Sequence, residues 1–266
     1  MINIALLKRE IKGSYILWLI FAGILLMYIS IIVTMFDPAL GEVLKQFSVA
    51  MPQMMAMFGM SVVGATLIEF MANYLYGFLM LIFPMVFVVI LANKLVAKHV
   101  DSGSMAYLLA APNSRKKLIR TQITVLMGEL VLLILFCTIV GIVASNSFFP
   151  GKLDVSAFIR LNIGVLGLHL AIAGFCFFAS CISNDTKLSL GLGAGVPTFF
   201  YLILMLGNMG GKLEPLKNAT IFSLFDSYQL MDNVAAGWWK VGVAAAIGIL
   251  FFVIGSRIFQ KRDLPL

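Results

Sequence analysis

The stretch that decides the fold is YILWLIFAGILLMYISIIVTMF, which runs from Tyr15 to Phe36 without a charged residue and stops at Asp37-Pro38. A bilayer core about 30 Å thick is crossed by about 20 residues of α-helix, so this stretch is long enough to span a membrane. It is too long for the apolar core of a signal peptide, and no small-residue cleavage site follows it. We expect it to remain in the protein as a membrane anchor.

Five further stretches have the same character, which predicts an all-α integral membrane protein with six transmembrane helices. The predicted spans are 15–36, 74–92, 121–143, 161–182, 188–207 and 241–259. The composition agrees, because 61% of the residues are hydrophobic, 12% are charged and the mean hydropathy is +1.03, against roughly 45–50% apolar and 25% charged residues in soluble domains. We find no repeat of fixed period, and residues 1–266 are expected to form a single transmembrane domain.

Lysine and arginine are unevenly distributed over the two sides of these predicted spans. One set of flanks holds 6 of them and the other holds 13, namely Lys8, Arg9, Lys12, Lys94, Lys98, Arg115, Lys116, Lys117, Arg120, Lys187, Arg257, Lys261 and Arg262. Cytoplasmic flanks carry the excess of basic residues. We therefore expect a multi-pass protein of the cell membrane, in contact with lipid, with both termini in the cytoplasm.

Three segments between the spans are long enough to have structure of their own. Residues 2–12 mix apolar with polar and charged side chains, which predicts an N-terminal interfacial amphipathic helix on the inner leaflet. Residues 93–120 form a polar and basic cytoplasmic loop. Residues 207–237 are too apolar for a solvated outer loop, so we expect re-entrant outer helices before the sixth span.

The sequence offers little chemistry for a reaction. His99 and His169 belong to no HExxH motif and have no Cys or carboxylate at helical ligand spacing, so no metal site is expected. The nearest approach to a phosphate-binding P-loop is Gly211-Lys212, which has Leu206 at the first glycine position and Leu213 at the hydroxyl position. We expect no catalytic residues and no cofactor bound by this chain.

Two other patterns have simpler explanations than a binding site. The net charge of +7 does not indicate a nucleic-acid partner, because the basic residues stand at the ends of apolar stretches rather than over one folded face. Gly191, Gly193 and Gly195 follow no predicted strand and lie inside an apolar stretch, so close helix packing explains them better than a dinucleotide loop. The three cysteines show no paired spacing that would indicate a disulfide framework.

Glu129 is the one carboxylate well inside a predicted span. An ionisable group in the membrane is a candidate functional residue, which here could relay a proton or meet a cationic substrate. The alternative is a protonated or hydrogen-bonded acid that only packs between helices.

The loop after the second span reads DSGSMAYLLAAPNSRKK from Asp101 to Lys117. It resembles the first cytoplasmic loop of type-2 ABC (ATP-binding cassette) transporter permeases, whose pattern is an acid, Gly, a Leu-Leu pair, Pro and then Ser-Arg. The final residues, FQKRDLPL from Phe259, look like a tail common in bacterial members of the exporter branch. The chain departs from the family at His99-Val100-Asp101, where glutamate pairs are frequent, and at Gln122, where Lys is common.

This resemblance implies that two permease chains, as a homodimer or a heterodimer, form the pathway and that a separate cytosolic ABC ATPase subunit docks on a coupling helix in the loop. ATP and magnesium would then bind at the partner ATPase. The residues implied in coupling are Asp101, Gly103, Met105, Leu108, Leu109, Pro112, Ser114 and Arg115. The loop's own chemistry agrees, because Gly103 and Pro112 delimit a short helix with Met105, Leu108 and Leu109 on one face.

The sequence thus predicts a permease subunit of an ABC exporter that moves a hydrophobic or amphipathic substrate, such as a peptide, toxin, antibiotic or drug. The layout is similar to that of exporters of amphipathic peptide toxins. The chain is not expected to be an enzyme itself. The alternatives are an ion-coupled secondary transporter that uses Glu129, for which an inverted repeat would be the signal, and an integral membrane enzyme.

Overall fold

The computed structural model describes residues 2–36, 50–57, 59, 66–110 and 114–263, and the side chains of 109 and 110 are outside this description. Within these ranges the chain is helical and contains no strand. The helices are α1 (Ile4–Thr34), α3 (Pro52–Met57), α4 (Leu67–Tyr74), η2 (Leu75–Leu79), α5 (Met80–Leu95), α6 (Ala97–Asp101), α7 (Ser104–Ala110), α8 (Arg115–Phe148), α9 (Val155–Ile182), α10 (Thr186–Asn208), η3 (Gly211–Ala219), η4 (Ile221–Leu224), α11 (Ser227–Met231) and α12 (Ala235–Lys261).

Six helical stretches in the described residues are long and apolar enough to cross a membrane, which confirms the predicted number. They are Ile4–Thr34, Leu67–Asp101, Arg115–Phe148, Val155–Ile182, Thr186–Asn208 and Ala235–Lys261. Most of these helices begin earlier than the predicted spans, because they start at polar capping residues that precede the apolar stretches. Asp154 and Asp185 accept hydrogen bonds from the backbone N–H groups of Ala157 and Leu188 at the starts of α9 and α10.

The second span begins earlier than predicted and contains a change of helix type. Thr66 and Glu69 form a reciprocal capping box at the start of α4. The helix therefore begins at Leu67, before the charged residue Glu69 that precedes the predicted apolar span. The single π-helical turn η2 then separates α4 from α5, and Pro84 lies inside α5. A π-helical turn rotates the residues that follow it relative to an unbroken helix.

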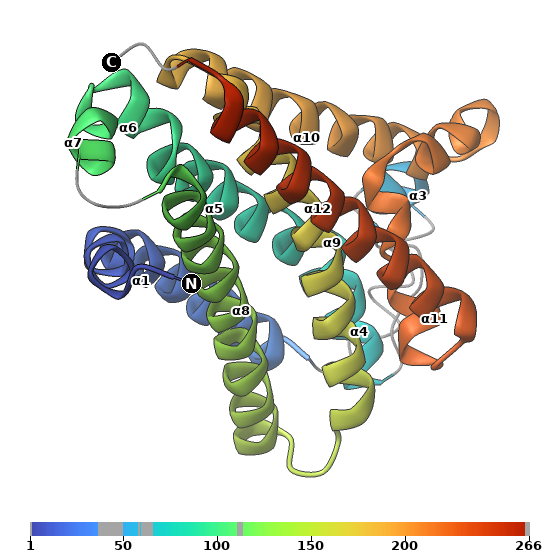
Figure 1. Ribbon diagram of the computed structural model, residues 1–266. Helices are drawn as coiled ribbons and strands as arrows, with labels where there is room; N and C mark the ends of the chain where they lie inside the picture. The colour runs from blue at the N-terminus through green and yellow to red at the C-terminus, as the bar shows by residue number, and fades with distance from the viewer. Residues whose placement is uncertain (1, 37–49, 58, 60–65, 111–113, 264–266) are drawn as a thin grey trace.

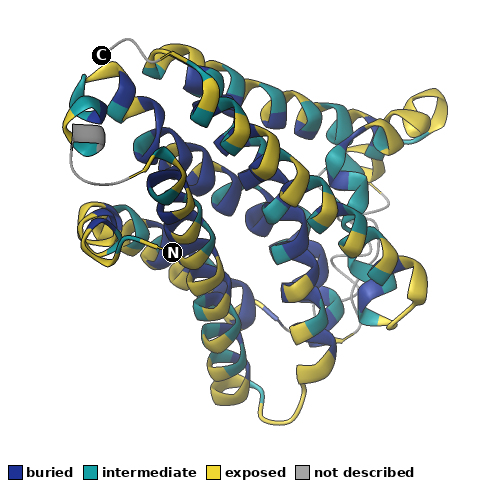
Figure 2. Ribbon diagram, viewed as in Figure 1, coloured by how far each residue is buried: buried dark blue, intermediate teal, exposed yellow. Residues whose placement is uncertain are grey.

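Helix α9 lies at the centre of the bundle, packed by α12, α5, α8 and α10. Its residues are mostly buried, whereas α1, α8, α10 and α12 each present an exposed side (Figure 2). The exposed sides carry large apolar residues such as Leu19, Leu132, Phe199 and Ile249. An apolar outer surface around a closed core is stable with lipid as the solvent.

The α9–α12 contact depends on glycines that let the two backbones touch. A Cβ atom added at Gly174 would stand 2.4 Å from the Gly248 carbonyl oxygen, and one added at Gly248 would stand 2.4 Å from the Leu170 carbonyl oxygen. The glycines predicted to serve close packing behave differently. Gly193 makes only ordinary contacts with Cys176, while a Cβ at Gly191 or Gly195 would meet no described atom within 4 Å, so that prediction was wrong for these two.

Two finer predictions are not confirmed. Residues 2–12 do not form a separate interfacial helix, because α1 continues without a break from Ile4 to Thr34. The outer segment before the last span forms three short helices, η3, η4 and α11, and their re-entry into the membrane stays a prediction. Its apolar composition has a packing reason, since Phe222 and Leu230 are buried.

Candidate coupling surface and the buried acids beside it

Residues near both ends of the chain bond to α8 and to the end of α9 at one end of the bundle, which we call the basic end. The Asn3 backbone N–H donates to the Thr121 hydroxyl of α8 at 3.0 Å. Arg115, also on α8, donates to the Arg262 carbonyl oxygen at 2.8 Å, and Arg262 donates to the Ser183 carbonyl oxygen at 2.9 Å. Residues far apart in sequence are therefore joined in one hydrogen-bonded surface.

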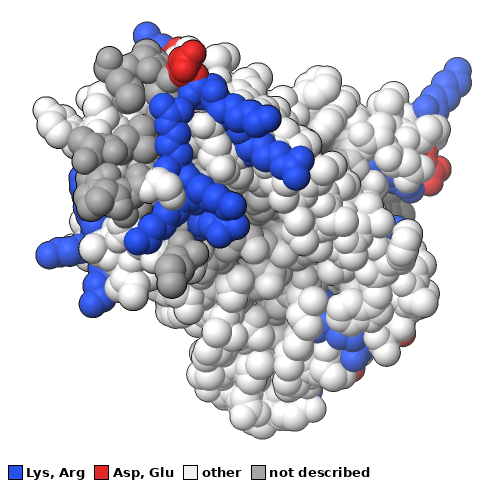
Figure 3. All heavy atoms as spheres, viewed as in Figure 1, with Lys and Arg blue, Asp and Glu red and all other residues white. Residues whose placement is uncertain are grey.

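Positive charge gathers at this end. In Figure 3 the lysine and arginine side chains concentrate at the upper left, the region that holds the C-terminus, α6 and α7 in Figure 1. The middle of the visible face carries almost no charged side chain of either sign. This separation is the three-dimensional form of the charge bias in the sequence.

The helix predicted between Gly103 and Pro112 is present as α7, Ser104–Ala110. Gly103 has a φ of +68°, a left-handed conformation that glycine adopts without strain, and it turns the chain between α6 and α7. The predicted apolar face is only partly available to a partner. Met105 is fully buried and Leu108 is partly buried against the core, whereas Tyr107 is 83% exposed.

The correction to the predicted docking face has a physical reason. Met105 and Leu108 cover the protein's own core, so the exposed side of α7 is that of Tyr107. The Leu109 side chain and Pro112 lie outside the described residues. Sequence spacing placed Met105 and Leu108 on one face correctly, but it could not tell whether that face turns toward the protein or away from it.

Three of the remaining predicted coupling residues, Asp101, Ser114 and Arg115, bond to elements other than α7. The Asp101 carboxylate accepts hydrogen bonds from the Thr186 hydroxyl at 2.8 Å and the Thr186 backbone N–H at 3.4 Å, which links α6 to the start of α10. Ser114 caps α8 by accepting from the Lys117 backbone N–H. The structure thus brings Asp101, Ser114 and Arg115 to the same end as α7.

The sequence did not reveal a contact next to this surface between the buried Glu10 and the partly buried His99. His99 Nε2 lies 3.3 Å from Glu10 Oε1, and His99 Nδ1 is hydrogen-bonded to the Ser104 hydroxyl of α7 at 3.0 Å. Glu10 is buried although it falls in the segment predicted to lie on the leaflet surface. The available signal for the burial of Glu10 was its spacing from Ser14, because residues i and i+4 share one face of a helix.

Glu129 is buried where α8 packs on α1. Ser14 donates its hydroxyl to Glu129 Oε1, and the Trp18 indole N–H donates to the Glu129 carbonyl oxygen at 3.2 Å. Glu129 Oε2 is buried and has no hydrogen-bond partner among the described residues. The acid is therefore both packed and incompletely satisfied.

His169 makes a polar contact between two helices. Its Nδ1 lies 2.8 Å from the Val165 carbonyl oxygen on its own helix α9, and its Nε2 lies 3.1 Å from the Leu81 carbonyl oxygen on α5. No group of three or more His, Cys, Asp or Glu residues that could hold a metal occurs in the described part of the chain.

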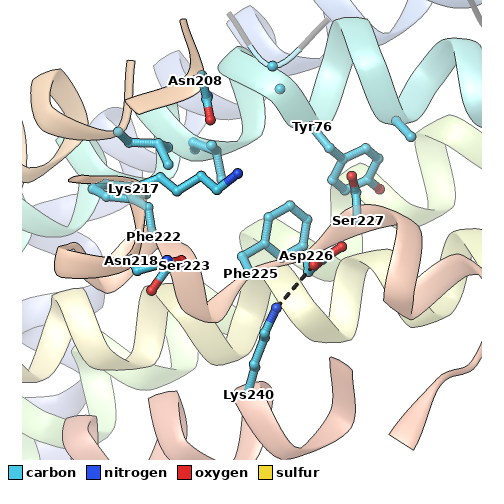
Figure 4. A pocket seen from close by; sticks show the side chains of 15 residues that line it. Tyr76, Asn208, Lys217, Asn218, Phe222, Ser223, Phe225, Asp226, Ser227 and Lys240 are labelled. Carbon is cyan, nitrogen blue, oxygen red and sulfur yellow. Dashed lines mark hydrogen bonds and ion pairs between the residues drawn. The ribbon is translucent and has the colours of Figure 1, made fainter. Parts of the chain in front are cut away.

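A cavity with a volume of about 280 Å³ lies at the opposite end of the bundle. Tyr76, on the π-helical turn, lines it from one side, while Lys217 and the ion pair of Lys240 with Asp226 line it from the other (Figure 4). The Lys240–Asp226 separation is 3.0 Å, and Lys217 pairs with Glu214 at 2.7 Å. Because each lysine already has an acidic partner, the cavity carries no clear preference for a charged ligand.

Comparison of this chain with protein-family models, with curated proteins and with solved structures gives no match.

Proposed function

We propose that this chain is the membrane-spanning permease subunit of an ABC exporter and receives its energy from a separate cytosolic ATPase at the basic end. The observation that carries the proposal is the continuity of that end. Helix α7 is tied through α6 and Asp101 to α10, and the Arg115–Arg262–Ser183 contacts tie α8 to the ends of α12 and α9. A force applied to α7 would therefore reach several spans at once.

The need for a partner follows from what the sequence lacks. A P-loop holds ATP phosphates with backbone amides and a lysine, and no such motif occurs in the chain. A permease without its own nucleotide site requires an energy source that docks on it. The exposed aromatic side chain of Tyr107 is a suitable contact for such a partner, since tyrosine is enriched at interface hot spots.

In this proposal the basic end faces the cytoplasm, where basic flanks also contact anionic lipid headgroups. Two permease chains and two ATPase subunits form the working exporter. The substrate is hydrophobic or amphipathic, because the spans present apolar and aromatic surfaces with few charges.

A second candidate function is favoured by one specific observation. Glu10 and Glu129 are both buried and both contact Ser14, through its hydrogen bonds to the Glu10 carbonyl oxygen and the Glu129 carboxylate. Neighbouring acids within a membrane are a feature of ion-coupled secondary transporters. Transport that persists without ATP and follows a proton gradient would favour this alternative.

The experiment that tests the proposal compares two exposed aromatic residues at opposite ends of the bundle. Tyr107→Asp places a charge on the exposed side of α7, and Trp239→Asp is the matched control, because Trp239 is 75% exposed. Loss of an aromatic hot spot costs about 2 kcal/mol or more, roughly a thirtyfold loss in affinity. The ATPase that copurifies from mild-detergent extracts should be lost with Tyr107→Asp and retained with Trp239→Asp.

Two outcomes of this comparison would contradict the proposal. Equal retention of the ATPase by both would refute docking on α7, and the absence of any copurifying ATPase with the unmodified chain would refute the proposed function. Leu108→Asp with Leu109→Asp is a less selective change, because Leu108 also packs against the core. Membrane insertion, followed by the amount of folded protein, should be the same for Tyr107→Asp and Trp239→Asp.

A further inference from the structure

An apolar groove runs between α1 and α8 on the outer surface of the bundle, with a volume of about 450 Å³. Tyr15, Trp18 and Leu19 line it from α1, and Leu132, Leu135 and Phe136 are among the residues that line it from α8. Four of these side chains are exposed, whereas Trp18 and Phe136 are partly buried against the core. The groove is therefore open to the membrane rather than to the bundle interior.

One polar group interrupts this apolar wall. Glu129 lines the groove, its side chain is more than nine-tenths buried, and its Oε2 atom has no hydrogen-bond partner among the described residues. Its other oxygen, Oε1, already accepts the Ser14 hydroxyl. None of the ion pairs formed by the described residues includes Glu129.

The aromatic residues beside the carboxylate are held in place. The Trp18 indole N–H donates to the Glu129 backbone carbonyl at 3.2 Å, and the Trp18 and Phe136 rings meet edge to face with centroids 5.6 Å apart. Aromatic faces attract cations in addition to burying apolar surface, and this attraction strengthens where water is excluded. The groove thus combines apolar walls with an aromatic corner, and the buried Glu129 Oε2 atom lies behind this lining.

We propose that this groove binds an amphipathic cation, a molecule with an apolar body and a single ammonium group that contacts Glu129 Oε2. Charge complementarity selects this occupant. A lipid chain alone would fill the apolar walls but leave the buried oxygen without a partner, which costs free energy. This inference rests on the proposed function insofar as it names the substrate class of the exporter.

The test uses Trp18 as a reporter inside the groove. The chain has three tryptophans, so Trp238→Phe with Trp239→Phe leaves Trp18 as the single one. The purified chain in lipid nanodiscs is titrated with a nitroxide-labelled hexadecyl-dimethylammonium probe and, separately, with an uncharged nitroxide probe of the same chain length. The cationic probe should quench Trp18 emission saturably, whereas the uncharged probe should quench it only in proportion to its amount in the membrane.

Three variants locate the effect at the carboxylate. Glu129→Gln retains an acceptor for Ser14 but removes the charge, and it should weaken binding of the cationic probe about tenfold or more. Leu135→Phe fills the groove with the carboxylate intact and should also weaken binding. Glu214→Gln removes an exposed acid far from the groove and should change nothing.

Equal quenching by the two probes, or unchanged binding with Glu129→Gln, would overturn the proposal and indicate that lipid alone fills the groove. Trp18 that neither probe can quench would overturn it too, because a second copy of the chain would then cover the groove. The assay contains no ATPase, so its result is independent of the copurification experiment. Each proposal can therefore fail without the other.

Discussion

The close contact between α9 and α12 allows a sharp prediction about Gly248→Ala. The new Cβ atom would lie 2.4 Å from the Leu170 carbonyl oxygen, 2.7 Å from its carbonyl carbon and 3.0 Å from the Ala171 nitrogen. All three are backbone atoms, so no flexible side chain can move aside. Since ordinary contacts begin at 3.4 Å, the helices would have to separate by about 1 Å, the size of gap that forfeits up to half of a contact's attraction.

The expected cost follows from two opposing effects. Overpacking in a tight core costs about 1–3 kcal/mol, while replacing glycine by alanine in a helix returns up to about 1 kcal/mol of helix propensity. A net destabilisation of about 1–2 kcal/mol corresponds to a decrease in Tm of roughly 2–8 °C for a chain of this size. Gly174→Ala should behave similarly, because its Cβ would lie 2.4 Å from the Gly248 carbonyl oxygen.

The protein supplies its own reporter for this measurement. Its three cysteines are free and buried, so a thiol-reactive fluorogenic dye reacts only when the bundle opens. Gly191→Ala is the matched control, because the same substitution there would meet no described atom within 4 Å, and it should leave Tm unchanged or raise it slightly. If Gly248→Ala and Gly191→Ala melt at the same temperature, the reasoning about backbone contact is wrong.

Three further predictions concern topology, packing and pH. In a background without native cysteines, Ser114→Cys should react only with reagents that reach the cytoplasm and Asn218→Cys with impermeant reagents added outside; the reverse pattern would invert the proposed orientation. Arg160 donates to two carbonyl oxygens of α11 at 2.9 and 2.6 Å, so Arg160→Ala should destabilise the fold by about 1–3 kcal/mol, and an unchanged Tm would refute that role. Hydrogen bonds from the Ala157 N–H and the Ser156 hydroxyl lower the pKa of Asp154 in the folded protein. The stabilisation by this cap is therefore complete at a pH above the ordinary Asp pKa of about 4. It is lost as the pH falls through the lower pKa of the folded state. Asp154→Ala should cost roughly 1 kcal/mol at neutral pH and less in acid, and a loss that does not depend on pH would contradict this.

The number and approximate position of the long helices followed from the sequence, because a bilayer requires long uncharged stretches regardless of how helices pack. Their true starts were less visible, since the capping residues stand outside the apolar stretches. Thr66 and Glu69 form a sequence-readable capping box that places the start of α4 seven residues before the predicted Tyr74. Local motifs of this kind carry information that hydropathy alone does not.

The direction in which each helix faces could not be read from the sequence. Met105 and Leu108 share a helix face as expected, but whether that face covers the core depends on how α7 is placed against α5 and α6. The sequence likewise does not tell which glycines lie at a close helix contact, because Gly248 packs against the backbone of α9 whereas Gly191 has no described atom near its Cβ position. The burial of Glu10 with His99 likewise depends on two segments that are far apart in sequence.

The measurement that most directly tests the coupling proposal is site-specific photocrosslinking in native membranes. A photoreactive phenylalanine analogue placed at position 107 reports what contacts the exposed side of α7, and the same analogue at position 239 reports the opposite end. We predict a crosslinked product at position 107 that contains a P-loop ATPase, and no such product at position 239. Crosslinking of position 107 to lipid alone, while the transport activity is intact, would contradict docking of an ATPase on this surface.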